Sequence, residues 1–238
     1  MKLAASSVEI QAHVIDMMKK TRACPPAHSC AASSRMPAKK TSRSKAATLA
    51  PCIQLKITLR GSRPAIWRRI VVPADMTLDR LHDVFQIAMG WTNSHLHQFI
   101  GEGGRFDGGT FRERDPDFGD CDDDAASERN HTVGDLAPRP KSKFAYEYDF
   151  GDGWLHDVKV EKILEPDPAL QPPVCLAGEN ACPPEDCGGI GGYYAMLERL
   201  ANPKHPGHED TKDWLGADWL STRFDVERVN AMLRRIRV

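Results

Sequence analysis

Two strand-like runs followed at once by a helical stripe constrain the fold of this chain more than any other feature. The first run has apolar residues at alternate positions, the period of a half-buried strand: Ile53, Leu55, Ile57 and Leu59. RGSRPA follows as a turn, and residues 66–72 (IWRRIVV) give a second run that Pro73 ends. Together they predict a β-hairpin.

A helix is expected directly after this hairpin. Thr77 is placed to cap its start, and Gly90 stands where a left-handed residue ends a helix. The residues between them carry an apolar stripe at helical spacing: Leu78, Leu81, Val84, Phe85, Ala88 and Met89. Strand–strand–helix is a β-grasp-like opening. The pattern therefore predicts an α+β fold, with a mostly antiparallel sheet built from hairpins and packed with helices.

A second hairpin is predicted in FAYEYDFGDGWLHDVKVEKI, after a strand over residues 95–100. A loop of Gly151, Asp152 and Gly153 would pair Phe150 with Trp154 and make one apolar face. It would also pair Tyr148 with His156, Tyr146 with Val158, and Phe144 with Val160. A two-residue turn would instead pair Asp149 with His156 as a carboxylate–imidazole dyad. The first register buries more aromatic surface and is the preferred prediction.

The remaining segments are expected to be loops and helices. Residues 101–131 are rich in Gly and Asp and predict a long solvated loop, whose acidic run lacks the spacing of an EF-hand. After Pro166 the chain is expected to be helical and loopy, with helices over 193–200 and around 213–215. Asp225 is placed to cap a last helix with a buried stripe of Val226, Val229, Leu233 and Ile236.

Charge divides the chain near Pro51. Residues 1–50 hold nine Lys and Arg against two acidic residues, a net charge of +7, and the remainder holds 23 against 31, a net charge of −8. We predict that residues 1–50 are a disordered basic extension, with a short helix over 8–20, and that 51–238 form a single domain. Translation from Met36 is the preferred explanation of the extension; a basic arm for nucleic acid and an organelle transit peptide are the alternatives.

The cysteines indicate a reducing compartment. Their number is seven, and the N-terminus lacks the apolar stretch of a secretory signal, so a cytoplasmic protein is expected. No apolar run approaches the roughly 20 residues that span a bilayer, so no membrane partner is expected. Cys175, Cys182 and Cys187 could bind zinc with His205 or His208 as the fourth ligand. Buried thiols and a redox pair are the alternatives.

Three further groups of residues could bind a ligand. His95 and His97 lie two apart on the expected strand and so share a face, where His156, Asp149 and Asp152 could join them around a divalent metal. Glu185 and Asp186 are assigned to the same polar site. GGIGGYYAMLERL could cradle a phosphate, but these two acidic residues precede its glycines and would repel an anion. The last group could grip nucleic acid: Arg60, Arg63, Trp67 and Arg68. Each group has a structural alternative. The histidines could be separate, each with its hydrogen bonds satisfied; the glycines could simply begin a helix; and the arginines could lie on an ordinary solvated hairpin.

A family resemblance covers residues 51–238. The segments that carry it are IQLKITLRGSRPAIWRRIVVPADMTLDRLHDVFQIAMGW, SHLHQF, YDFGDGWLH, ACPPEDCGGIGGYYAMLERLANPKHPGHE and WLG. In this order they resemble the plasmid pRiA4b ORF-3-like family, whose members are also described as passenger proteins of an insertion element. The resemblance implies association with plasmids and transposases and no established activity. Members of the family are sometimes labelled resolvase-like, but this sequence lacks the catalytic motif of a serine recombinase.

Three functions follow as hypotheses. The first is a non-enzymatic accessory or interaction protein of mobile elements, since Gly-x-Ser-x-Gly, HExxH and a paired-carboxylate site are all missing from the sequence. The second is a metal-binding protein or metal-dependent enzyme, with zinc as the expected cofactor. The third is a nucleic-acid-binding protein linked to transposition. A protein or DNA is accordingly the expected partner.

Overall fold

The computed structural model describes residues 50–103, 109–113, 125–167, 170–216 and 218–236. The predicted basic extension, its short helix and the acidic run at 115–124 lie outside these residues. The strands are β1 (Cys52–Leu59), β2 (Trp67–Pro73), β3 (His97–Ile100), β4 (Thr110–Arg112), β5 (Ala126–Ser127), β6 (Lys143–Tyr148), β7 (Trp154–Leu164) and β8 (Val174–Glu179). The helices are α2 (Leu78–Met89), the short 3-10 helix η1 (Glu128–Asn130), α4 (Val133–Leu136), α5 (Gly189–Ala201), α6 (His208–Leu215) and α7 (Val226–Leu233).

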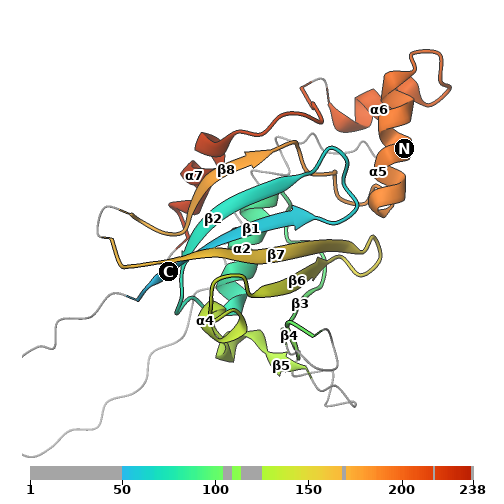
Figure 1. The fold of residues 1–238 in the computed structure, drawn as a ribbon. Coiled ribbons are helices and arrows are strands. Elements are labelled where there is room, and N and C mark those ends of the chain that lie inside the picture. The colour runs from blue at the N-terminus through green and yellow to red at the C-terminus, as the bar shows by residue number, and fades with distance from the viewer. Residues whose placement is uncertain (1–49, 104–108, 114–124, 168–169, 217, 237–238) are drawn as a thin grey trace, which may run out of the picture. The chain divides into compact units, whose positions relative to one another are not determined.

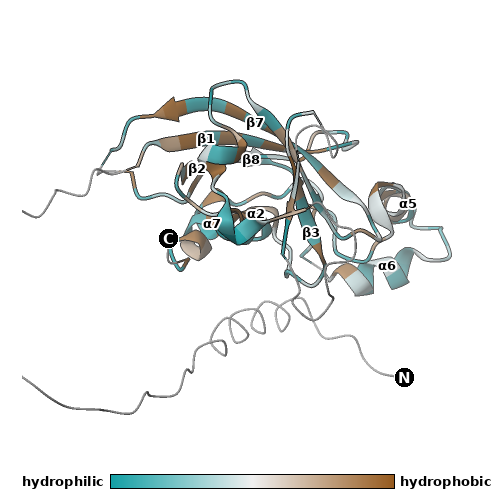
Figure 2. Cartoon of the chain, turned by 90° about the horizontal axis from the view of Figure 1, so that it is seen from below, coloured by the Kyte–Doolittle hydropathy of each residue, from teal (hydrophilic) through white to brown (hydrophobic). Residues whose placement is uncertain are grey.

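The strands form one sheet in the order β5-β4-β3-β6-β7-β1-β2-β8, shown in Figure 1. Neighbouring strands are antiparallel except β4 and β5, which are parallel. The strands in Figure 2 show hydrophobic and hydrophilic residues in turn, as a sheet with one covered face requires. The predicted α+β class is confirmed. No helix in the described ranges is long and apolar enough to cross a membrane.

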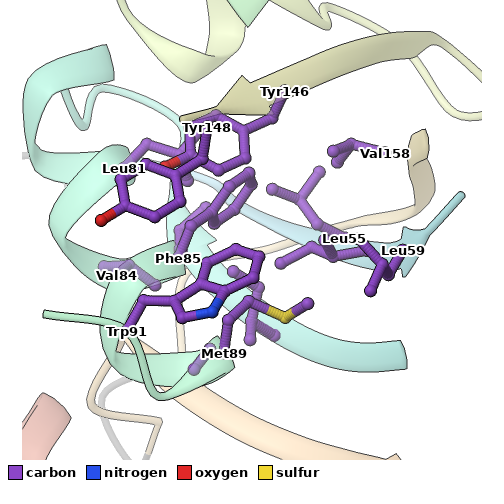
Figure 3. Packing of buried hydrophobic residues seen from close by; sticks show 14 of the residues in the cluster. Leu55, Leu59, Leu81, Val84, Phe85, Met89, Trp91, Tyr146, Tyr148 and Val158 are labelled. Atoms are coloured by element: carbon purple, nitrogen blue, oxygen red, sulfur yellow. The ribbon is translucent and has the colours of Figure 1, made fainter. Parts of the chain in front are cut away.

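The predicted strand–strand–helix opening is confirmed. Helix α2 lies across the sheet and buries Leu81, Val84 and Phe85 against strand residues such as Leu55 and Tyr146 (Figure 3). The Phe85 and Tyr146 rings meet edge to face with centroids 5.1 Å apart. Gly90 is left-handed as predicted (φ 95°), whereas Thr77 holds the N-cap position without a capping side-chain hydrogen bond.

The register predicted for the second hairpin is wrong by two residues. Tyr148 pairs with Trp154, and Tyr146 pairs with His156, so the predicted apolar face is kept but every partner changes. The reason is Asp149, which takes φ 56° and accepts hydrogen bonds from Gly151 N (2.9 Å) and Asp152 N (3.3 Å). This cap ends β6 early and makes a five-residue loop, 149–153.

The segment after Pro166 also departs from the prediction, because it contributes edge strand β8. Helix α5 begins at Gly189, about one turn earlier than predicted, and the short helix expected around 213–215 is confirmed as α6, which begins at His208. Helix α7 is confirmed, with the Asp225 carboxylate accepting from Arg228 N at 3.0 Å. In the described parts of residues 101–131, β4, β5 and η1 replace the predicted continuous loop.

Candidate metal centre

Three loops that are distant in sequence meet at one end of the sheet. They are residues 90–96 after α2, loop 149–153 of the β6–β7 hairpin, and residues 182–188 before α5. The Trp91 indole N–H donates to Pro183 O at 3.0 Å, and Asp149 N donates to Leu96 O at 2.9 Å. The Trp91 ring stacks on Tyr148, with centroids 5.0 Å apart. The aromatic core therefore anchors all three loops together.

Each loop supplies one side chain to a common point. His95 Nε2 lies 3.3 Å from Asp186 Oδ1 and 3.7 Å from Asp149 Oδ2. Among the described residues, this is the one group of three or more His, Cys, Asp or Glu side chains whose ligand atoms lie within 4.8 Å of one another. The Asp149 side chain is 10% exposed and that of Asp186 is 75% exposed. The group is thus anchored on one side and open to solvent on the other.

The Nε2 atom of His95 makes no hydrogen bond within the described residues. It is buried from solvent, and two carboxylates face it. A buried polar atom without a partner costs about 1–3 kcal/mol. This atom is therefore placed for a group that would lie between it and the two carboxylates.

Backbone strain is concentrated around the same point. Asp149 and Asp186 have φ of 56° and 59°, and Asn93, two residues before His95, has φ of 57°. They are three of the five non-glycine residues with positive φ in the described ranges. Left-handed residues other than glycine are uncommon, and strain of this kind gathers at functional sites. Each of these loops therefore holds one residue in a costly conformation.

Two predicted polar-site residues support the loops. Asp152 Oδ2 accepts from Gly188 N at 3.1 Å, and the backbone of Gly189 approaches the Asp152 carbonyl so closely that a Cβ would lie 2.5 Å from its oxygen. Glu185 accepts from Thr92 N at 3.2 Å and from the hydroxyls of Tyr148 and Thr92. Burial and the Glu185 carboxylate raise the pKa of Tyr148, so this phenol stays a hydrogen-bond donor.

Two predicted members of the cluster lie elsewhere. His95 precedes β3 rather than lying in it, so it does not share a strand face with His97. The His97 ring stacks on His82 at 3.4 Å, and its Nε2 lies 2.8 Å from Glu128 Oε2. His156 is buried opposite Tyr146, whose carbonyl its Nδ1 meets at 3.2 Å. The alternative dyad of Asp149 with His156 is therefore not formed.

The predicted zinc ligands are not brought together. Cys175 lies buried in β8, and the ligand atoms of Cys175, Cys182, Cys187 and His205 do not form a convergent group among the described residues. Burial raises the pKa of Cys182 and Cys187 to about 12 each, so both remain thiols at neutral pH. His205 Nδ1 accepts from Gly207 N at 3.0 Å. This arrangement favours buried thiols over a zinc site.

The predicted arginine patch is not one surface. Arg68 is 1% exposed and cannot contact a nucleic acid, which corrects its assignment. Arg60 pairs with Asp157, while Arg63 is exposed. The Trp67 ring lies under the Lys56 ammonium at 4.8 Å and the Arg69 guanidinium at 5.2 Å. Of the four predicted residues, the structure leaves Arg63 as an exposed cation without a carboxylate partner in the described ranges.

The comparisons with known proteins now give the chain its family. Residues 51–231 match the sequence model described as plasmid pRiA4b ORF-3-like protein. The chain belongs to this family. The uncharacterized protein y4hQ of Sinorhizobium fredii (strain NBRC 101917 / NGR234) is 39% identical over 183 residues, covering 76% of this chain and 90% of the relative.

A solved structure also has this fold. The crystal structure of MM3350, a protein of unknown function from Methanosarcina mazei Go1, has a TM-score of 0.68 and 35% identity, covering 76% of this chain and 98% of that chain. The pRiA4b ORF-3-like family thus gives the fold and no activity. In this chain, the segments YDFGDGWLH and ACPPEDCGG that carried the resemblance supply Asp149 and Asp186.

The sequence places His95, Asp149 and Asp186 in one larger predicted polar site. It does not separate these three from His97 and His156, which the structure places elsewhere. Asn93 was missed, although an Asn next to the turn-forming Ser94 is a signal for a left-handed residue. The glycines after Asp186 were the other usable signal, because they indicate close approach of two backbones.

Proposed function

We propose that this protein binds a divalent transition-metal ion through His95 Nε2 and the carboxylates of Asp149 and Asp186. The observation that carries the proposal is the buried Nε2, which makes no hydrogen bond within the described residues and faces two carboxylate oxygens at 3.3 and 3.7 Å. Two atoms bound about 2.1 Å from one tetrahedral ion lie about 3.4 Å apart. The two distances from His95 Nε2 therefore fit an ion placed between it and the carboxylates.

The ligand set favours Zn²⁺ or Mn²⁺ over Mg²⁺ and Ca²⁺. An imidazole nitrogen is a good ligand for transition metals such as Zn²⁺, and carboxylates are good ligands for Mn²⁺. Three protein ligands with one side open to solvent leave a position for water, as in catalytic rather than structural metal sites. The support that Asp152 and Glu185 give to the loops is the outer-shell support that such sites need. A metal-dependent role at this end of the sheet is thus the proposed function.

Metal binding is tested on anaerobically purified protein. Apo protein is titrated with Mn²⁺, followed by the loss of the free-ion EPR signal, and with Zn²⁺ by calorimetry. His95→Gln and Asp149→Asn should weaken binding about 100-fold or more, since each removes a direct ligand. Asn at position 149 keeps the oxygen that caps loop 149–153, so this variant separates metal binding from loop structure.

His205→Gln and Cys182→Ser are the controls, because they remove members of the alternative zinc set. Unchanged affinity in both controls is expected. A wild-type protein that binds neither ion, or His95→Gln binding as tightly as wild type, would overturn the proposal. Loss of binding in the controls alone would move the site to the cysteine segment.

The accessory role in mobile elements remains a wider proposal, supported by membership of a plasmid-derived family. It predicts that tagged protein recovers a specific protein partner from its host, and that this recovery survives His95→Gln. The nucleic-acid alternative now rests on Arg63 and the basic extension, since Arg68 is buried.

A further inference from the structure

A groove beside the proposed metal centre has its own chemistry. It is a shallow, open groove of about 350 Å³ between α5 and α6, which lie side by side in Figures 1 and 2. Asp186 forms one wall, so the groove adjoins the metal centre. Its other lining residues include Met196 and Arg199 from α5, and Asp210 and Trp214 from α6. Ligand pockets begin at about 300 Å³, so the groove suits a small molecule.

The groove carries two unpaired charges of opposite sign. The Arg199 guanidinium and the Asp210 carboxylate both line it, and neither makes a hydrogen bond or ion pair with a residue in the described ranges. They also do not pair with each other, although exposed Lys and Glu side chains nearby do so, as in Lys212 with Glu209 at 3.3 Å. Both residues are exposed, and neither side-chain charge is neutralised by a partner in the described ranges.

An aromatic surface completes the groove. Trp214 is 46% exposed, whereas Met196 beside it is buried. An indole exposed in a concave, partly apolar site is the side chain that most often provides binding energy, because its large flat face packs against ligand rings. A ligand complementary to these side chains carries a negatively charged group, a positively charged group and an apolar or aromatic group.

We infer that this groove binds a small zwitterion of the amino-acid class with an aromatic or large apolar side chain. Its carboxylate pairs with Arg199, its ammonium with Asp210, and its side chain packs on Trp214 and Met196. Planar guanidinium groups bind carboxylates with two parallel hydrogen bonds, which sets the orientation of the ligand. This site shares only the Asp186 wall with the metal centre and does not depend on a bound metal.

The experiment uses phenylalanine as the probe, with EDTA present so that the metal centre plays no part. Titration is followed by calorimetry and by tryptophan fluorescence. Three analogues each lack one recognised group: phenylpropionate lacks the ammonium, phenethylamine lacks the carboxylate, and glycine lacks the ring. Each should bind about tenfold more weakly than phenylalanine, since each loses one charge-assisted or aromatic contact.

Variants then assign each group to its residue. Arg199→Gln should weaken phenylalanine about tenfold and leave phenethylamine unchanged, because that analogue has no carboxylate to lose. Asp210→Asn should weaken phenylalanine and leave phenylpropionate unchanged. Glu198→Gln on α5 and Asp213→Asn on α6 are matched controls, since both are exposed and neither lines the groove.

The inference is overturned if phenylalanine does not bind in EDTA at millimolar concentration, or if both groove variants bind it like the controls. Binding that appears only with added Mn²⁺ or Zn²⁺ also overturns it, because the metal would then be the receptor. That last result would support the proposed metal site, so the two proposals fail separately. Unchanged thermal unfolding of the exposed variants excludes misfolding as the cause.

Discussion

The side chain of Asn230 forms hydrogen bonds with both backbone polar groups of Cys175. Its Oδ1 accepts from Cys175 N at 2.7 Å, and its Nδ2 donates to Cys175 O at 2.9 Å. Cys175 lies in β8, the edge strand of the sheet, so these groups would otherwise be open to another chain. The amide of Asn230 thus takes the place of a neighbouring strand, which ties α7 to the sheet.

Replacing Asn230 by Ala should therefore expose the edge of β8. We expect a loss of about 2 kcal/mol in the free energy of unfolding, because two partly buried backbone groups lose their partners. We also expect concentration-dependent self-association through the edge. Urea unfolding and light scattering measure the two effects. Glu227→Ala, an exposed change in the same helix, should leave both unchanged; equal behaviour of the two variants would contradict the assignment.

Two neighbouring glycines of α5 should respond oppositely to alanine. A Cβ at Gly192 would lie 1.8 Å from Cys187 O, whereas a Cβ at Gly191 meets nothing within 4 Å. Gly192→Ala should cost about 3 kcal/mol of stability by overpacking. It should also weaken metal binding, because Cys187 follows Asp186. Gly191→Ala should be neutral or stabilise by up to about 1 kcal/mol. Thermal unfolding with metal titration tests both, and similar stability of the two variants would contradict the close packing.

How much the sequence predicts depends on the range of the interactions. The strands and helix around Leu55 and Phe85 follow from apolar periodicity, which is local. The hairpin register does not, because Asp149 ends β6 through its own side-chain hydrogen bonds and a left-handed backbone. The grouping of Asp149 with His95 and Asp186 depends on three loops packing together, and no period in the sequence encodes that packing.

Arg68 shows the same limit for a single charge. A strand position followed by Arg69 predicts a solvated cation, yet its guanidinium donates to carbonyls of Trp67, Glu179 and Asn180 at 2.8–2.9 Å, and its Nε to Ala88 O at 2.8 Å. The Phe224 ring lies 4.0 Å from it. Ala88 lies in the last turn of α2, Glu179 ends β8 and Asn180 follows it, and β8 was not predicted. The burial of Arg68 could not be predicted without knowing these partners.

Removing the Arg68 side chain should therefore be costly. Arg68→Met leaves several carbonyls without donors, and we expect a loss of about 3 kcal/mol or more in the free energy of unfolding. Arg60→Met removes an exposed ion pair with Asp157 and should cost less than about 1 kcal/mol. Chemical denaturation compares the two. A loss in Arg68→Met no larger than that in Arg60→Met would show that the buried guanidinium does not hold β2, β8 and α2 together.

Two buried histidines should make stability depend on mild acid. Burial, and then the neighbouring His97, lower the pKa of His82 to about 3, and burial lowers the pKa of His156 to about 4. Each is neutral in the folded protein but takes up a proton in the unfolded chain below its ordinary pKa of 6.5. The unfolded state therefore binds more protons in this range, and stability must fall as the pH falls.

Between pH 6.5 and pH 5, the free energy of unfolding should fall by roughly 1 kcal/mol per pH unit for each of these histidines. Glu161, whose pKa the Arg69 guanidinium lowers to about 2, contributes only below its ordinary value of 4.5, outside this window. Urea unfolding across the window gives the slope. His82→Gln should halve the part of this slope that comes from His82 and His156, even if the variant is less stable at every pH. The exposed control His205→Gln should keep the full slope. A slope unchanged in His82→Gln would mean that folding does not lower the pKa of His82.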